Sequence, residues 1–176
     1  YLANRYSFSL INDNCHAIGS KYNNSFKYAI KYADFVTHSY HAVKNITTGE
    51  GGAILTNKKF FKEKFDQLRS HGVIKKNKKN LGPWYYEMTS LGYNYRITDF
   101  QCALGINQLK NLNFKVNKRR VLAKNYDNAF KNIDSFKVPK ILDNCQSSYH
   151  LYPLQFNFKK NKIIKIFFFN KIKKKK

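Results

Sequence analysis

The chain has 176 residues, of which 43% are hydrophobic and 16% aromatic, enough for one globular core but not for an obvious two-domain enzyme. Its formal net charge of +23 raises nucleic acid or an anionic membrane as partners. Only five of the 33 basic residues are arginine, although arginine makes the bidentate contacts with phosphates and bases. Asn, Ile, Phe and Tyr are also abundant, so we interpret the lysine excess as a drift toward amino acids with AT-rich codons. This interpretation argues against a nucleic-acid partner.

The cysteines and the apolar runs limit where the protein works. Three widely separated cysteines, Cys15, Cys102 and Cys145, do not form a disulfide framework and indicate a reducing cytoplasm. There is no CxxC pair and no HExxH pattern, so no metal site is expected. No apolar run is long enough to span a bilayer, and no signal peptide is visible. We expect a cytoplasmic protein without a metal.

The first half of the chain reads as three strands and a helix. Apolar runs predict strands over Phe8–Asn12, Ala33–His38 and Gly52–Thr56, because each is short and bounded by turn residues. Helical spacing of apolar residues predicts a helix over Lys58–Ser70, with Asn57 as its N-cap. The dipeptide His71-Gly72 should end that helix.

The second half reads as two helices and a strand. After a basic, polar loop over Lys75–Pro83, Thr98 is the expected N-cap of a helix over Asp99–Asn111, with a core-facing side made of Phe100, Ala103, Leu104 and Leu109. A longer helix over Asn113–Asn132 would turn a second set of side chains toward the core, namely Val116, Leu122, Ala123, Tyr126 and Phe130. Residues Ser148–Phe158 alternate like a strand.

This order of elements predicts an α/β body joined to a smaller α+β domain. The chain begins at Tyr1 rather than at a methionine, and its last residues, 159–176, are almost entirely Lys, Asn, Ile and Phe. We interpret the sequence as a fragment, and the basic end as an aberrant or disordered tail.

One loop carries residues suited to covalent chemistry. Lys44 is followed by Thr47-Thr-Gly-Glu-Gly-Gly52, a turn whose glycines allow backbone to approach a ligand closely. A nucleophilic lysine needs a pocket that lowers its pKa and faces an electrophilic carbonyl. Ser39, five residues upstream, could donate a hydrogen bond to a phosphate. Alone, the pattern also fits a surface lysine beside a hairpin turn.

Five segments read together are more specific than this loop. In chain order they are Asp13-Asn-Cys-His16-Ala-Ile-Gly-Ser20, Ser39-Tyr-His-Ala-Val-Lys44, Thr47-Thr-Gly-Glu-Gly-Gly-Ala53, Arg69-Ser-His-Gly72 and Leu91-Gly-Tyr-Asn-Tyr-Arg96. They resemble the signature segments of the DegT/DnrJ/EryC1/StrS family, sugar aminotransferases that depend on pyridoxal phosphate (PLP), over about residues 8–158. The resemblance implies an α/β chain that is part of a PLP-dependent transferase of fold type I (aspartate-aminotransferase-like).

The same resemblance implies a domain division. Residues 1–112 would be the C-terminal part of the PLP-binding large domain, and 113–158 the connecting helix and the start of the small α+β domain. The remaining residues, 159–176, would be the aberrant or disordered tail.

The resemblance also assigns roles. Lys44 would bind PLP covalently and then act as general base and acid, while Asp13 would pair with the pyridine nitrogen and keep it protonated. Weaker than these, Tyr149 and His150 would lie near the sugar. The other cofactor contacts would be His16 to the ring, Ser39 to the phosphate and Asn94 to the phosphate of the neighbouring subunit, since active sites in this family lie at a dimer interface.

The expected reaction moves an amino group from glutamate to a nucleotide-linked sugar. The segments Ser-Tyr-His-Leu-Tyr-Pro and Ile-Thr-Thr-Gly-Glu-Gly-Gly look closest to the members that aminate UDP-linked 4-keto-6-deoxy-N-acetylhexosamines on the way to pseudaminic acid, in surface-glycan or nonulosonic acid biosynthesis. The chain departs from the family at Asn12 and Asn14, beside the retained Asp13, and at Tyr40 and Ala42. Because segments that grip the phosphate and close the site lie outside residues 1–158, we expect weak or no activity from the chain as given.

Three alternatives stay open. A PLP-dependent dehydratase of the same fold would carry His in place of Lys44, so Lys44 speaks against it. An inactive or regulatory member of the family would retain the fold without turnover. A basic nucleic-acid-binding module would bind with a steep salt dependence.

Overall fold

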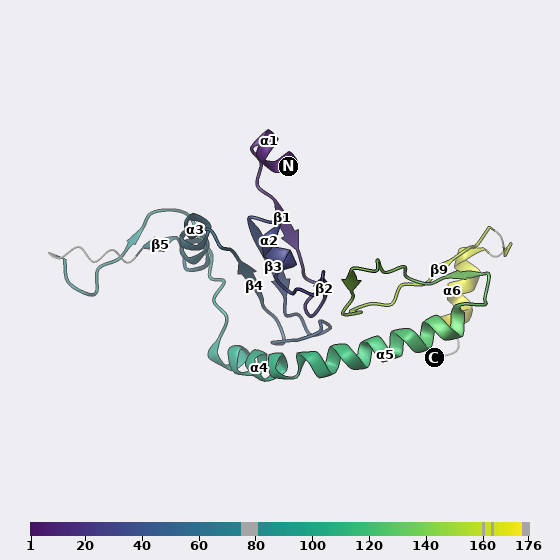
Figure 1. The fold of residues 1–176 in the computed structure, drawn as a ribbon. Helices are drawn as coiled ribbons and strands as arrows, with labels where there is room; N and C mark the ends of the chain where they lie inside the picture. The colour runs from purple at the N-terminus through teal and green to yellow at the C-terminus, as the bar shows by residue number, and fades with distance from the viewer. Residues whose placement is uncertain (75–80, 160, 163, 174–176) are drawn as a thin grey trace.

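The computed structural model describes residues 1–74, 81–159, 161–162 and 164–173. At its centre lies a three-stranded sheet made of β1 (Ile11–Asp13), β3 (Phe35–Ser39) and β4 (Gly52–Leu55), in the order β1-β3-β4. β1 runs parallel to β3, and β4 runs antiparallel to it. In Figure 1 the sheet stands above two long helices, with further elements to either side.

The sheet confirms two predicted strands and shifts the third. β3 and β4 lie where Ala33–His38 and Gly52–Thr56 were expected. The prediction of a strand over Phe8–Asn12 was too early, because β1 begins at Ile11. Just before β1, the Leu10 N–H donates to Asp34 Oδ2 at 2.7 Å. A side-chain oxygen thus takes the place of the backbone carbonyl that a neighbouring strand would supply.

Helix α3 (Lys59–Arg69) packs against the sheet through aromatic side chains. The Phe35 ring contacts those of Phe61 and Phe65, with centroids 5.4 and 5.1 Å apart. The helix begins one residue later than predicted, with Lys58 rather than Asn57 as N-cap. It ends at Arg69, one residue before the predicted Ser70. The predicted glycine stop is present: Gly72 has φ +69°, and its N–H donates to Gln67 O at 2.9 Å.

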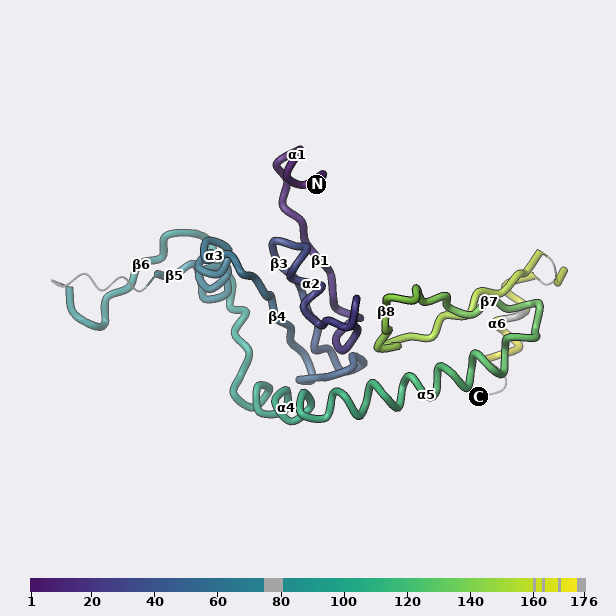
Figure 2. Tube along the Cα trace, viewed as in Figure 1, coloured from purple at the N-terminus to yellow at the C-terminus, as the bar shows by residue number. Residues whose placement is uncertain are grey.

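Helices α4 (Asp99–Lys110) and α5 (Leu112–Phe130) follow one another with a break at Asn111. Figure 2 traces them as one long run beneath the sheet. Thr98 caps α4 as predicted. The Gln101 N–H donates to Thr98 Oγ1 at 3.3 Å, and the Thr98 N–H donates back to Gln101 Oε1 at 3.1 Å, a capping box.

The capping box predicts a stability change. Thr98→Ala removes the acceptor for the Gln101 N–H, and loss of an N-cap costs about 1 kcal/mol. We expect the free energy of unfolding, measured with urea, to fall by that amount, while Thr98→Ser leaves it nearly unchanged because serine keeps the hydroxyl. Equal losses in the two variants would show that the cap is not the cause.

The predicted apolar face of α4 is not buried. Phe100 is 93% exposed, and Leu104 and Leu109 are also exposed, so nothing in the described ranges covers that side. In α5 the prediction is half right. Val116 and Ala123 are buried, each at 2% exposure, whereas Leu122 and Tyr126 are exposed. Val116 faces the loop after β1, where a Cβ added to Gly19 would lie 2.7 Å from Val116 Cγ2.

The C-terminal part forms short antiparallel pairs and a last helix. Residues 148–158 are not the predicted strand, since only β9 (Gln155–Phe156) is extended and paired, with β7 (Phe136–Lys137). Residues 159–176 were expected to be an aberrant or disordered tail. Nine of them, Lys165–Lys173, form helix α6, so disorder was wrong for that part. The predicted basic loop over Lys75–Pro83 lies largely outside the described residues.

The remaining elements are short. They are α1 (Leu2–Tyr6), β2 (Lys21–Tyr22), α2 (Tyr28–Lys31), β5 (Val73–Ile74), β6 (Glu87–Met88) and β8 (Cys145–Gln146). Among the described residues, no helix is both long and apolar enough to cross a membrane, and no cluster of three or more metal-ligating side chains forms.

Candidate active site

Asp13 lies at the carboxyl end of β1, beside Thr37 of the parallel strand β3. Its Oδ1 accepts a hydrogen bond from the Cys15 N–H at 3.1 Å and one from the Thr37 hydroxyl at 3.5 Å. Hydrogen bonds from the Cys15 side chain and backbone lower the pKa of the Asp13 carboxyl, and Thr37 and His16 lower it further. Asp13 is therefore a carboxylate at neutral pH.

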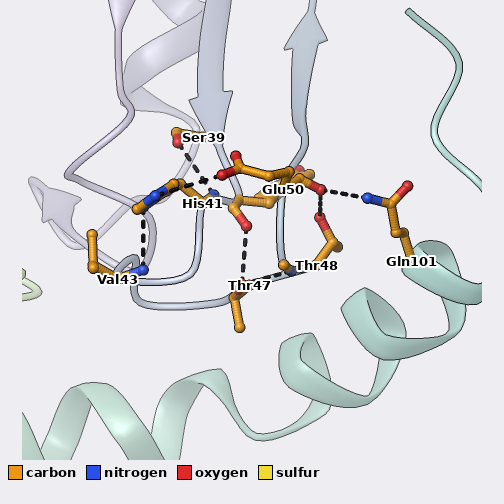
Figure 3. A network of polar contacts seen from close by, with 9 residues as sticks. Ser39, His41, Val43, Thr47, Thr48, Glu50 and Gln101 are labelled. Carbon is orange, nitrogen blue, oxygen red and sulfur yellow. Dashed lines mark hydrogen bonds and ion pairs between the residues drawn. The ribbon is translucent and has the colours of Figure 1, made fainter.

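The Lys44 loop leaves the same end of β3 and returns to β4. Tyr40, the first residue after β3, anchors it, because its N–H donates to Gly51 O at 2.8 Å and its carbonyl accepts from the Thr48 N–H at 3.0 Å. The Thr47 hydroxyl donates to the same carbonyl at 3.1 Å. Figure 3 shows Thr47, Thr48 and Glu50 of this loop with their polar contacts, among them the bond from the Thr48 hydroxyl to Glu50 O at 2.7 Å. The loop thus holds Lys44 on a fixed turn, where the Lys44 N–H donates to His41 O at 3.0 Å.

The glycines of the turn are needed for close packing. Gly51 has φ +143°, and a Cβ there would lie 2.6 Å from Thr48 Oγ1. A Cβ on Gly52 would lie 2.6 Å from the carbonyl oxygen of His38, on the neighbouring strand. Larger residues at these two positions would push the loop away from β3 and from helix α4, whose Gln101 amide donates to Glu50 O at 3.0 Å (Figure 3).

His150 comes to this site from the far end of the chain. Its ring meets the His16 ring edge-on, with centroids 4.4 Å apart. Burial lowers the pKa of His150, and the nearby charges of His16, Lys44 and Arg119 lower it further. Lys44 also acts electrostatically on the Cys15 thiol. The amine, the two imidazoles and the carboxylate thus gather at one end of the sheet.

Hydrogen bonds from the side chains of two arginines and a serine hold the segment carrying His150. Arg119 Nη1 donates to the carbonyls of Tyr149 and His150, each at 3.3 Å, and Arg120 Nε donates to Ser147 O at 2.9 Å. The fully buried Ser148 bonds to Ser20 through its hydroxyl at 3.1 Å. Helix α5 and the loop after β1 therefore fix this segment from two sides.

The predicted residues differ in how far the structure brings them together. Asp13, His16, Lys44 and His150 share the site. Ser39 ends β3 beside Gly52, and its Oγ accepts from the His41 N–H at 3.4 Å, so the hydroxyl hydrogen can still donate. Tyr149 has φ +47° and its ring lies 6.3 Å from that of Tyr152; burial raises the pKa of its hydroxyl.

Asn94 lies elsewhere. It forms a bridge with Ser70 at the end of α3, and no hydrogen bond joins it to the Lys44 loop in the part of the chain that the structure describes.

Two residues that the sequence did not single out, Cys15 and Thr37, do contact Asp13. The contact of Thr37 with Asp13 depends on the strand register, which pairs two residues that are 24 positions apart in the sequence. The sequence alone does not give that register.

The depressed pKa of His150 predicts a pH-dependent stability. The unfolded chain takes up a proton near the ordinary histidine value of 6.5, whereas the folded chain does so only at lower pH. The stability is therefore complete above 6.5 and falls as the pH drops toward the folded value. We expect this fall, measured by urea unfolding between pH 7.5 and 5, to become shallower in His150→Gln. It does not vanish, because burial also lowers the pKa of His38. Identical slopes in the two proteins would contradict the assignment.

Comparison with known proteins decides the family. The sequence profile of the DegT/DnrJ/EryC1/StrS aminotransferase family matches residues 1–175. The chain belongs to this family. The resemblance found in the five segments is thereby confirmed.

Individual relatives agree with this membership. The chain is 45% identical over 153 residues to the UDP-4-amino-4,6-dideoxy-N-acetyl-beta-L-altrosamine transaminase of Campylobacter jejuni strain 81-176, covering 87% of this chain and 39% of that protein. It is 40% identical to the transaminase of the same name from Helicobacter pylori, again over 87% and 39% of the two chains. The chain thus spans less than half the length of these relatives.

Solved structures confirm the expected fold. Helicobacter pylori PseC, an aminotransferase involved in the biosynthesis of pseudoaminic acid, superposes with a TM-score of 0.79 at 39% identity, over 89% of this chain and 40% of that one. A putative sugar aminotransferase from Streptococcus pneumoniae, solved in its PMP form, gives 0.75 at 27% identity, over 89% and 41%. The chain has the α/β fold of part of a fold type I, aspartate-aminotransferase-like protein.

Proposed function

We propose that the chain carries the lysine-bearing part of a PLP-dependent aminotransferase, which moves an amino group from glutamate to a nucleotide-linked 4-keto-6-deoxy sugar. One observation carries this proposal. The charge of Lys44 lowers the pKa of His150, the rings of His150 and His16 are in contact, and the charge of His16 lowers the pKa of Asp13. These groups lie at the carboxyl end of β1 and β3. Ligands of open α/β sheets bind at this end of the strands.

The residues present fit PLP. A carboxylate, a primary amine and a hydroxyl are the partners that its ring nitrogen, aldehyde and phosphate require, and Asp13, Lys44 and Ser39 supply them at neighbouring strand ends. His150 Nδ1 is buried and has no hydrogen-bond partner among the described residues. Such an orphaned donor or acceptor beside Lys44 points to a polar ligand that completes the site.

Each residue has a distinct part in the proposed reaction. PLP supplies an electron sink for the carbon that exchanges its proton. Lys44 Nζ would hold the cofactor covalently and would take and return the proton at that carbon. Asp13 keeps the ring nitrogen protonated by its negative charge. Ser39 donates to the phosphate, and His16 contacts the ring.

The names of two relatives support a proposal for the substrate class. The Campylobacter and Helicobacter proteins are named for transamination of a UDP-linked amino sugar, and we propose a substrate of that class for this chain, in pseudaminic acid or another surface-glycan pathway. Tyr149 and His150 would lie near the sugar. The protein would act in the cytoplasm as a homodimer, with Asn94 completing the phosphate site of the neighbouring subunit.

We also propose the domain division. Residues 1–112 would belong to the PLP-binding large domain, and residues 113–158 would form the connecting helix and the start of the small domain. Helix α5 begins at Leu112, one residue before this boundary.

The test is a coupled assay on the chain loaded with PLP. Glutamate and a UDP-linked 4-keto-6-deoxy-N-acetylhexosamine are supplied, and mass spectrometry follows the aminated sugar and 2-oxoglutarate. Formation of both products in equal amounts supports the proposal. Covalent PLP binding without either product would agree with the weak or absent activity expected of the chain as given and would keep the inactive or regulatory member as the alternative. The absence of PLP binding would contradict the proposal itself.

A further inference from the structure

Asp13 is held from two directions, one local and one distant. The Cys15 N–H, two residues on, makes a contact that many aspartates make in turns. The Thr37 hydroxyl comes from the next strand, 24 residues away, and meets the same oxygen, Oδ1, at 3.5 Å. Only the parallel register, which sets Asp13 opposite Thr37, allows the second contact.

The Cys15 thiol joins the same group. Its Sγ lies 3.8 Å from Thr37 Oγ1, and its single hydrogen has two acceptors within reach, this oxygen and the Asp13 carboxylate, whose pKa it lowers. When the thiol donates to the Thr37 oxygen it occupies a lone pair there, and the hydroxyl hydrogen is free to point at Asp13. The three side chains form a small, directed network.

The two hydrogen bonds of known length hold the same carboxylate oxygen. Both end on Oδ1. Asp13 as a whole is exposed. With Oδ1 held by two donors, rotation of the carboxylate is restricted.

We propose that Thr37 and Cys15 are positioning residues for Asp13, which fix Oδ1 so that Oδ2 faces the pyridine nitrogen of the cofactor. The inference rests on the function proposed above. A carboxylate already oriented before binding loses less rotational freedom when the cofactor arrives. The pKa of Asp13, lowered by hydrogen bonds from Cys15 and Thr37, agrees with this arrangement, since both donors stabilise the charged form.

The test uses Thr37→Val, which keeps the β-branched shape suited to a strand and removes only the hydroxyl. The first readout is the pKa of the Asp13 carboxyl in the cofactor-free chain, followed by carbon-13 NMR. We expect it to rise in Thr37→Val, because a donor to the carboxylate is lost, and to return in Thr37→Ser. The second readout is PLP affinity, which we expect to weaken about two- to tenfold, the worth of one hydrogen bond.

Thr56→Val is the matched control. Its hydroxyl donates to Asp34 O at 2.7 Å, just beyond the end of β4 and away from Asp13. It costs a comparable hydrogen bond without touching the carboxylate, so the Asp13 pKa and the PLP affinity should stay unchanged. Circular dichroism verifies that each variant is folded.

The outcomes separate the two proposals. An unchanged Asp13 pKa in Thr37→Val, with PLP still bound through Lys44, overturns the positioning role and leaves the function standing. A raised pKa that Thr37→Ser restores, together with weakened PLP binding, supports the positioning role. If the unaltered chain does not bind PLP through Lys44, the proposed function fails, and the positioning role fails with it.

Discussion

Lys44→Ala is expected to abolish covalent attachment of PLP and with it the visible absorption band of the lysine-bound cofactor. The loop would remain in place, because its anchors are the backbone of Tyr40 and the hydroxyls of Thr47 and Thr48 rather than the Lys44 side chain. Any turnover of the unaltered chain should fall by at least about 10²- to 10⁴-fold, the usual contribution of a general acid or base. A spectral titration with PLP and the coupled assay measure the two effects.

The matched control is Lys58→Ala. Lys58 forms an ion pair with Asp34 beside the sheet, outside the candidate site. Its loss removes a lysine near the same strands without touching the proposed cofactor partners. A full absorption band in Lys44→Ala, or its loss in Lys58→Ala, would show that the wrong lysine has been assigned.

Asp13→Asn is the second substitution with a large expected effect. Asparagine has nearly the same shape, and its carbonyl can still accept the Cys15 N–H, but it carries no charge to hold a proton on the ring nitrogen. The loss of a hydrogen bond to a charged group should weaken PLP affinity about 10- to 100-fold. Turnover should be lost with it, because an unprotonated ring is a poor electron sink.

Asp34→Asn serves as the comparison. The pKa of Asp34 is also lowered, by Lys58 and the Leu10 N–H, but the residue precedes β3 and so lies at the opposite end of the strand. We expect this variant to be less stable and to bind PLP as well as the unaltered chain. Equal PLP affinities in Asp13→Asn and the unaltered chain would remove Asp13 from the cofactor site.

Features set by neighbouring residues were predictable from the sequence. The Thr98 capping box and the Gly72 stop depend on contacts within a few positions, so residue type and spacing identify them. The strands β3 and β4 were recognisable for the same reason. Lys44 and Asp13 gained their roles from a resemblance that the family match then confirmed, whereas their individual roles remain proposals.

Features set by contacts between residues far apart in the sequence were not predictable from it. The alternation in Ser148–Phe158 predicted a strand, yet the positive φ of Tyr149 breaks it. There the carbonyls bond to Arg119 instead of a neighbouring strand. The apolar side of α4 was expected to be buried, but helical spacing cannot reveal which element covers it. Thr37 was missed because its link to Asp13 exists only in the strand register.

The central claim is that Lys44 binds PLP, and one measurement tests it most directly. The chain is incubated with PLP, reduced with borohydride, digested and mapped by mass spectrometry. We predict that the reduced cofactor is found on the peptide that contains Lys44 and is absent from it when reduction is omitted. Cofactor attached mainly to another of the many lysines, or to none, would contradict the account.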